Sequence, residues 1–249
     1  MTEQWPVYVI NLDRSPDRWD AMCDAFHGES LIRFTGVDGR QWGADGEFHV
    51  KQRPKFKPEA WDRLVSDGIL HALADEFWPW IPGEVGCALS HINLWKEISK
   101  SDSSWTIVLE DDAEPTMVGG TLQGAVEEIF PPPEDADIVF LFGRDSHLEM
   151  AITDEDNRFL NGWSNLGYMI TPRGAQAAVD ASLPMLLPCD MQWWMRTFRG
   201  YVMQVPMPFP SLPKISAYAM PTAVVKHADS ALKSTFTVDG SKPWKRSRY

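Results

Sequence analysis

The chain has 249 residues, of which 44% are hydrophobic and 23% charged, and these ordinary proportions exclude a disordered, collagen-like or coiled-coil protein. The net charge of −12 disfavours a broad nucleic-acid-binding face, because an acidic surface repels phosphates, although a local nucleic-acid site stays open. The three cysteines are widely spaced and form no CxxC pair, which argues against a disulfide framework and favours a reducing compartment.

The beginning of the chain predicts a strand, a helix and a second strand. Residues 7–10 form a short apolar run, as in a strand buried on both faces of a parallel sheet. Ser15 and Pro16 are typical of a helix start, and this helix should run to about Phe26. Residues 31–37 predict the second strand. This order is the unit of a doubly wound α/β fold, with a Rossmann-like sheet flanked by helices.

The clearest helix is predicted over residues 84–99, and a buried strand follows over residues 105–109. Ser90 and His91 are expected on the side of this helix that faces away from the core. The reason is an apolar stripe that recurs at helical spacing elsewhere on the helix, formed by Val85, Leu89, Ile92 and Trp95.

The remaining elements are expected from shorter patterns. A helix after Pro188 should carry Asp190, and the proline-rich chain from Met203 onward should wrap the domain or be partly disordered. The other expected elements are helices over residues 117–130 and 172–181, strands over 138–142 and 166–170, and a long loop over 143–162.

The charge distribution divides the chain into two parts. Residues 226–249 hold six basic residues against two acidic ones, a net +4, which leaves −16 on the rest of the chain. We expect a single α/β domain over residues 1–225 and a basic C-terminal tail over residues 226–249. The tail is either a lid over an anionic ligand or partly disordered.

The sequence also predicts a location. Residues 1–14 lack a basic region followed by a long apolar run, so no secretory signal is evident. No stretch approaches the roughly 20 apolar residues of a membrane span. We therefore expect a cytoplasmic protein with no transmembrane segment, and a peripheral contact with a membrane stays open.

Glu110, Asp111 and Asp112 are the strongest chemical signal. Three adjacent carboxylates repel one another unless a cation or several donors compensate them. Because side chains alternate along a strand, Glu110 and Asp112 should share one side while Asp111 faces away. Two hard oxygen ligands at the carboxyl end of a strand suit Mg²⁺ or Mn²⁺ bound together with a substrate phosphate. The alternative is a solvated acidic turn or a helix start.

Six sequence blocks resemble family 25 glycosyltransferases, which include bacterial lipooligosaccharide galactosyltransferases and are related to collagen galactosyltransferases. The blocks occur in the order 7–18, 37–39, 83–91, 108–113, 167–175 and 189–190. The resemblance covers roughly residues 5–195. It implies a GT-A fold, a UDP-sugar donor (usually UDP-galactose), a divalent metal and inversion at the anomeric carbon. Residues 40–58 and those after Thr197 match poorly, and we expect them to read the acceptor.

The resemblance also implies which residues act at the site. Glu110 and Asp112 correspond to the acidic motif that holds Mn²⁺ or Mg²⁺ on the donor diphosphate, and His227 is the candidate for a further ligand. Asp190 lies where the family places the base that takes the proton of the attacking hydroxyl. The residues expected to bind the donor are Asn11, Leu12, Arg14, Arg18, Asp38, Gly39, Ser90, His91 and Asp111.

Local structural roles remain as alternatives for these residues. Arg14 and Arg18 could pair with Asp17 and Asp20 on the surface of their helix. Asp38 could only shape a turn, His91 could be a structural histidine, His227 could lie on the surface, and Asp190 could cap its helix.

The leading hypothesis is a metal-dependent, inverting glycosyltransferase. It would move galactose or glucose from a UDP-sugar to a hydroxyl of a glycan such as lipopolysaccharide. One alternative keeps this chemistry but has a protein hydroxyl or a hydroxymethylated nucleic-acid base as the acceptor. The other alternative is a catalytically silent GT-A-like binding module.

Overall fold

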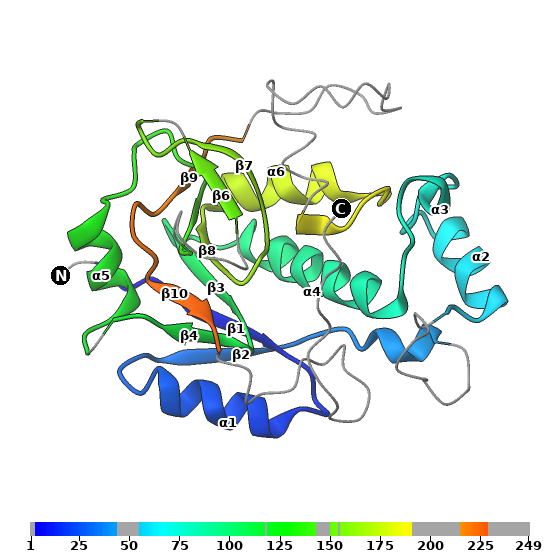
Figure 1. The fold of residues 1–249 in the computed structure, drawn as a ribbon, viewed down its shortest axis with the longest axis horizontal. Helices are drawn as coiled ribbons and strands as arrows, with labels where there is room; N and C mark the ends of the chain where they lie inside the picture. The colour runs from blue at the N-terminus through cyan, green and yellow to red at the C-terminus, as the bar shows by residue number, and fades with distance from the viewer. Residues whose placement is uncertain are drawn as a thin grey trace.

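A computed structural model describes residues 3–43, 55–117, 119–142, 150–153, 155–190 and 215–228. Its centre is a six-stranded sheet in the order β2-β1-β3-β8-β5-β9 (Figure 1). In that order the strands span Leu31–Thr35, Val7–Asn11, Thr106–Glu110, Gly167–Ile170, Ile138–Phe140 and Ala217–Ala219.

The strand directions make this a mixed sheet. β2, β1 and β3 are parallel, with Val7 opposite Leu31 on one side and Ile107 on the other. β8 runs antiparallel to both β3 and β5, and β5 is parallel to β9. Residues 106–109 are fully buried, as the continuous apolar run predicts for a central strand. The predicted fold class, an α/β domain with a mixed sheet flanked by helices, is confirmed.

Helices cover both sides of the strands β1 and β2. Helix α1 lies on one side, and α4 lies on the other side next to α6, with which it packs (Figure 1). Four of the α-helices begin with a proline, whose fixed φ suits the first helical position. The helices span Pro16–Ala25 (α1), Gly39–Trp42 (the 3-10 helix η1), Pro58–Ser66 (α2), Ala74–Phe77 (α3), Pro82–Ile98 (α4), Leu122–Ile129 (α5) and Pro172–Ser182 (α6).

Helix α4 is buried more completely than its sequence pattern predicts. Ser90 and His91 were expected to face away from the core, and this expectation is wrong, because they are only 2% and 0% exposed. The physical reason is that both flanks of α4 are covered: Ser90 meets Val37 just before η1, and His91 meets Tyr168 of β8 and Glu110 of β3. The two helices touch through glycines: a Cβ atom on Gly86 would lie 2.6 Å from the carbonyl oxygen of Val37.

Two later segments also differ from expectation. The long loop expected over residues 143–162 is wrong, because β6 (Met150–Thr153) and β7 (Phe159–Trp163) form an antiparallel pair within it. The chain after residue 203 does not merely wrap the domain, since β9 forms an edge of the central sheet. Polar residues conceal the strands of the first segment, and the prolines around the three-residue strand β9 conceal that of the second.

Residues 225–228 tie the late part of the chain to the acidic triplet. β10 (Val225–His227) pairs with β4 (Ala113–Pro115), so that His227 lies opposite Ala113. The first two residues of the expected tail thus belong to a strand, while the rest of the tail, 229–249, and the lid assigned to it lie outside the described residues.

Two further helices, expected over residues 117–130 and after Pro188, are described in part or begin later than expected. The helix expected from residue 117 begins only at Leu122, after Thr121, whose side chain accepts a hydrogen bond from the backbone of Gly124. Cys189 and Asp190 are helical as expected, and residues 191–200 lie outside the described residues. Among the described helices, none has the length and apolar character needed to cross a membrane.

Candidate active site

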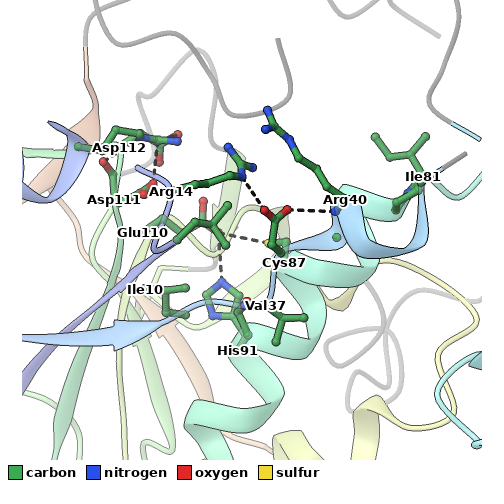
Figure 2. Close-up of a pocket in the computed structure, with 18 residues that line it drawn as sticks. Ile10, Arg14, Val37, Arg40, Ile81, Cys87, His91, Glu110, Asp111 and Asp112 are labelled. Atoms are coloured by element: carbon green, nitrogen blue, oxygen red, sulfur yellow. Dashed lines mark hydrogen bonds and ion pairs between the residues drawn. The ribbon is translucent and has the colours of Figure 1, made fainter. Parts of the chain in front are cut away.

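The predicted site residues gather around one cavity of about 190 Å³ at the carboxyl ends of β1 and β3 (Figure 2). In open α/β sheets this is where ligands bind. The start of α4 and the helix η1 form the opposite wall. Ten of the predicted site residues line the cavity: Leu12, Arg14, Arg18, Asp38, Gly39, Ser90, His91, Glu110, Asp111 and Asp112.

Arg18 holds the acidic triplet together. Its Nη2 atom lies 2.8 Å from Asp111 Oδ1 and 2.9 Å from Asp112 Oδ2, and its Nε atom donates to the carbonyl oxygen of Asp111. β3 ends at Glu110, so strand alternation does not continue into the turn, and the expectation that Asp111 faces away from Glu110 and Asp112 is wrong, because all three line the cavity. The suggested surface pair of Arg18 with Asp20 is wrong, because Arg18 is buried and paired with the triplet.

Asn11 fixes the carboxylate of Asp111 from the other side. The amide of Asn11 donates to Asp111 Oδ2 at 2.7 Å and to the carbonyl oxygen of Ser15 at 3.0 Å. Arg33 in turn donates to Asn11 Oδ1 at 2.9 Å. Burial raises the pKa of Asp111 to about 6, although Arg18 and Asn11 act in the opposite direction. Asn11 therefore orients an acidic residue and is not among the residues that line the cavity.

Arg14 and Asp38 form the rim of the cavity. The Nε atom of Arg14 lies 2.7 Å from Asp38 Oδ2, and this ion pair replaces the suggested pair with Asp17. The other carboxylate oxygen of Asp38 accepts from the backbone of Arg40 and so begins η1. Asp38 thus shapes a turn as well as facing the cavity. Arg14 keeps part of its side chain exposed at the opening.

Ser90 has a structural contact that sequence reasoning did not assign to it. Its hydroxyl accepts from the backbone of Val37 at 2.8 Å and donates to the carbonyl oxygen of Gly86 at 2.7 Å. Ser90 therefore ties the segment before η1 to α4 and holds one wall of the cavity in place.

His91 belongs to a buried hydrogen-bond chain that ends at Glu110. Its Nε2 atom lies 3.1 Å from Glu110 Oε1, and its Nδ1 atom lies 2.9 Å from the hydroxyl of Tyr168. Trp95 donates to the same hydroxyl at 2.8 Å. Tyr168 was not predicted as a site residue, although it lies inside the block 167–175. The hydroxyl group of a tyrosine within an otherwise apolar strand was the feature of the sequence that could have indicated it.

These hydrogen bonds shift the pKa values of His91 and Glu110 in opposite directions. Burial opposes charge on His91, but the hydrogen bonds to Cys87 and Glu110 outweigh it and raise the pKa of His91 to about 9. Burial likewise acts to raise the pKa of Glu110, but the hydrogen bond and charge of His91 outweigh it and lower this pKa. Glu110 is therefore kept as a carboxylate at the cavity floor.

Asp112 and His227 lie close enough to each other to be ligands of one divalent cation. Asp112 Oδ1 is buried and accepts no hydrogen bond from the described residues, and His227 Nδ1 lies 3.9 Å from it. The backbone of Ala228 donates to the carbonyl oxygen of Asp112 and holds the two segments together. Burial and the charge of Glu110 raise the pKa of Asp112. Asp112 and His227 therefore offer one oxygen and one nitrogen ligand to a divalent cation, and Glu110 lines the same cavity.

Asp190 is anchored close to the cavity without lining it. The preceding residue, Cys189, is buried, accepts a hydrogen bond from Asn165 at 3.2 Å, and interacts with the thiol of Cys87. Cys87 is a lining residue, so the backbone that carries Asp190 begins behind the cavity wall. The structure brings Asp190 to the neighbourhood of the other predicted residues but does not place it among them.

Comparison with known proteins gives a consistent family assignment. The family described as "Glycosyltransferase family 25 (LPS biosynthesis protein)" matches residues 4–130. Similar proteins include Procollagen galactosyltransferase 1-A of Xenopus laevis, at 32% identity over 204 residues, and Procollagen galactosyltransferase 1 of Danio rerio, at 27% over 199 residues. These matches cover 74% of this chain, and the chain spans about 30% of the length of these relatives.

Solved structures give weaker likenesses. HddC from Yersinia pseudotuberculosis has a TM-score of 0.43 at 8% identity, with 90% of this chain and 93% of that chain covered. An active-site mutant of LgtC has a TM-score of 0.33 at 8% identity, with 70% of this chain and 62% of that chain covered.

Proposed function

The chain belongs to glycosyltransferase family 25, and from this premise we propose that it is a metal-dependent, inverting hexosyltransferase. It would transfer galactose or glucose from a UDP-sugar to a hydroxyl of a glycan such as lipopolysaccharide. The observation that carries the proposal is the Oδ1 atom of Asp112. This atom is buried, accepts no hydrogen bond from the described residues, and lies 3.9 Å from His227 Nδ1.

The charge of the cavity explains why a cation belongs in this proposal. Three carboxylates face it from the triplet, and the buried guanidinium of Arg18 compensates only part of their charge. A donor diphosphate would be repelled by such a floor unless a divalent cation lay between them. Glu110, Asp112 and His227 would hold Mn²⁺ or Mg²⁺ there. When bound, this metal neutralises negative charge on the departing nucleoside diphosphate.

The rim residues would bind and orient the donor. Arg14 offers a guanidinium that can pair with phosphate oxygens through parallel hydrogen bonds. Asp38 would accept from a ribose hydroxyl. Gly39 would offer its backbone to the nucleotide, and its lack of a side chain lets η1 pack against Pro82 at the start of α4, since a Cβ there would clash with the carbonyl oxygen of Pro82.

Asp190 would act as the base of a direct displacement. The acceptor oxygen forms a bond to the anomeric carbon as the bond from that carbon to the phosphate oxygen breaks. The electron pair of the broken bond leaves with UDP, and the proton of the acceptor hydroxyl passes to the carboxylate of Asp190. Attack from the face opposite the diphosphate inverts the anomeric configuration.

A second acceptor class has its own support. The relatives named procollagen galactosyltransferases match 74% of this chain, which favours a protein hydroxyl as the alternative to a glycan. An acceptor screen with purified glycans and hydroxylated peptides separates the two classes, because both use the same donor.

The test is a thermal-shift experiment with UDP and Mn²⁺, added separately and together. A ligand that binds only the folded state stabilises it by roughly 2.7 kcal/mol at a concentration 100 times its Kd, so the pair should raise Tm by several degrees. Glu110→Gln and Asp112→Asn should abolish the joint effect. Glu97→Gln, an exposed charge on the same helix as His91, is the control. No shift, together with no hydrolysis of UDP-, GDP- or CMP-sugars, would favour a silent binding module.

A further inference from the structure

Cys87, His91 and Glu110 place three different ligand atoms on the floor of the cavity. Cys87 and His91 lie four residues apart on α4, so that they share a face of the helix, and Glu110 reaches them from the end of β3 (Figure 2). His91 Nε2 lies 3.1 Å from Glu110 Oε1, and Cys87 Sγ lies 3.9 Å from the same oxygen. The three ligand atoms all lie within 4.8 Å of one another.

These distances agree with the geometry of a tetrahedral zinc ion. Bonds of about 2.0 Å to nitrogen and oxygen and about 2.3 Å to sulfur place N and O about 3.3 Å apart, and S and O about 3.5 Å apart. The observed distances of 3.1 and 3.9 Å differ from these by a few tenths of an ångström. Side-chain rotations that bring Cys87 Sγ nearer to the other two ligand atoms would close the site around an ion.

The charges of the three groups also match a divalent ion. A thiolate and a carboxylate carry two negative charges, and a neutral imidazole adds none. A bound metal deprotonates a coordinating thiol outright, so Cys87 would supply its charge as a thiolate once the ion is bound.

The surroundings of His91 are those of a metal ligand. In metal sites the second ring nitrogen of a histidine normally donates to a fixed acceptor, which holds the ring and the tautomer. The hydroxyl oxygen of Tyr168 lies 2.9 Å from His91 Nδ1 and is itself held by Trp95. An ion at Nε2 would displace the proton that Nε2 shares with Glu110, while Tyr168 would continue to hold Nδ1.

We propose that Cys87, His91 and Glu110 form a binding site for a borderline-soft divalent cation such as Zn²⁺, with its fourth position open to the cavity. All three residues line the cavity, which gives an ion a way in. The set differs from Glu110, Asp112 and His227 by its thiolate, which selects Zn²⁺ over Mg²⁺ or Mn²⁺. The two sets share Glu110, so Zn²⁺ held here would compete with the hard cation. That consequence rests on the proposed function, whereas the zinc site itself does not.

The test uses Co²⁺ as a spectroscopic substitute for Zn²⁺ on the metal-free, reduced protein. One equivalent of Co²⁺ should produce a thiolate-to-cobalt charge-transfer band in the near ultraviolet and the visible bands of tetrahedral cobalt, and Zn²⁺ should abolish both. Cys87→Ser should remove the charge-transfer band, and His91→Ala should weaken Co²⁺ binding at least tenfold. Cys23→Ser, which changes an exposed cysteine, is the matched control and should keep the spectrum.

Loss of metal binding must be distinguished from loss of folding. Circular dichroism establishes that each variant is folded, and Cys87→Ala serves if the serine variant is not. Absence of the charge-transfer band from the wild type would overturn the proposal, as would a band that persists in folded Cys87 variants or is lost only in Cys189→Ser. No sugar nucleotide or turnover enters the measurement, so its failure is distinct from a failure of the proposed function.

Discussion

The Nη2 atom of Arg18 lies 2.8 Å from the Oδ1 atom of Asp111, and both side chains are one-tenth exposed or less. Removal of one partner from such a buried pair leaves the other charge without compensation, which typically costs about 3–5 kcal/mol. Arg18 also contacts Asp112, so it stabilises the whole turn that follows β3. A positive charge is thus built into the fold where the sequence concentrates negative charge.

Arg18→Met should therefore lower the free energy of unfolding by about 3 kcal/mol, because the substitution keeps the side-chain volume but removes the charge. Urea-induced unfolding at pH 7 measures the effect. Arg63→Met is the matched control, since the pair of Arg63 with Asp67 is exposed and should be worth at most about 0.5 kcal/mol. A loss below 1 kcal/mol for Arg18→Met would contradict a stabilising role for the buried pair.

Asp111 should make stability depend on pH between about 4 and 6. Its pKa of about 6 in the folded state exceeds the ordinary value of 3.8, so in this window the folded state binds a proton that the unfolded state does not. The contribution of Asp111 to the free energy of unfolding is therefore largest near pH 4 and falls by roughly 3 kcal/mol as the pH rises to 6.

Comparison of Asp111→Asn with the wild type isolates this effect, because the variant cannot ionise. The variant should gain stability relative to the wild type as the pH rises from 4 to 6, measured by urea unfolding at each pH. Asp24→Asn removes an exposed acidic residue from α1 and controls for the change in net charge. A difference of opposite slope would show that Arg18 and Asn11 outweigh burial.

Tyr168→Phe should remove the group that joins His91 to Trp95. The buried indole N–H of Trp95 would lose its acceptor, which costs about 1–3 kcal/mol, and His91 would no longer be held against Glu110. We expect weaker joint binding of UDP and Mn²⁺, measured by calorimetry, in addition to the loss of stability.

Tyr218→Phe provides the comparison, since the hydroxyl of Tyr218 donates to Asp135, which does not line the cavity. This variant should bind UDP and Mn²⁺ like the wild type. Equal binding by both variants would remove Tyr168 from any positioning role.

Gly86→Ala should separate η1 from α4. The added Cβ atom would meet backbone atoms, the carbonyl oxygen of Val37 at 2.6 Å and the nitrogen of Gly39 at 2.7 Å, neither of which can rotate away. We expect a loss of about 2 kcal/mol in thermal or urea unfolding and a reduced affinity for UDP. Gly124→Ala is the control, because its Cβ would meet only the Thr121 hydroxyl at 3.2 Å and should change stability by less than about 1 kcal/mol.

Asp190→Asn should lower turnover by about 10²–10⁴-fold, the usual contribution of a general base, while KM for the donor stays near its wild-type value. Steady-state kinetics with a UDP-sugar and the best acceptor measures both parameters. Asp180→Asn, on the exposed face of α6, controls for the loss of an acidic residue. Turnover close to that of the wild type would assign Asp190 to the helix rather than to the chemistry.

The first half of the fold was predictable because its elements have strong periodic signals. The apolar run at residues 7–10, the helix start at Pro16 and the stripe on α4 each gave an element of the correct type. The strands β6 and β7 were not predictable, because their residues lack a continuous apolar run or a clear alternation. Each of these two strands forms by pairing with the other, and this pairing is not indicated by the residues of either strand alone.

The sequence predicted which residues line the cavity better than it predicted which residues contact one another there. Position after a strand and resemblance together brought ten lining residues to one cavity. The partners of Arg18 and Arg14 could not be read from the sequence, since helix spacing suggests Asp17 and Asp20 whereas the fold brings Asp111 and Asp38 closer. Burial of His91 likewise depends on Tyr168 of β8 and Glu110 of β3, which no local pattern of α4 encodes.

The pairing of β10 with β4 has a consequence for how the protein comes into being. The turn that carries Asp112 is translated long before residues 225–228, yet the backbone of Ala228 donates to Asp112 and His227 stands opposite Ala113. A nascent chain that already contains β1, β3 and the acidic triplet thus still lacks His227, one of the residues of the proposed cation site. Ligand binding should therefore emerge late in translation, and a ribosome-stalled chain ending before Val225 should bind the cation more weakly than one in which β10 has left the exit tunnel.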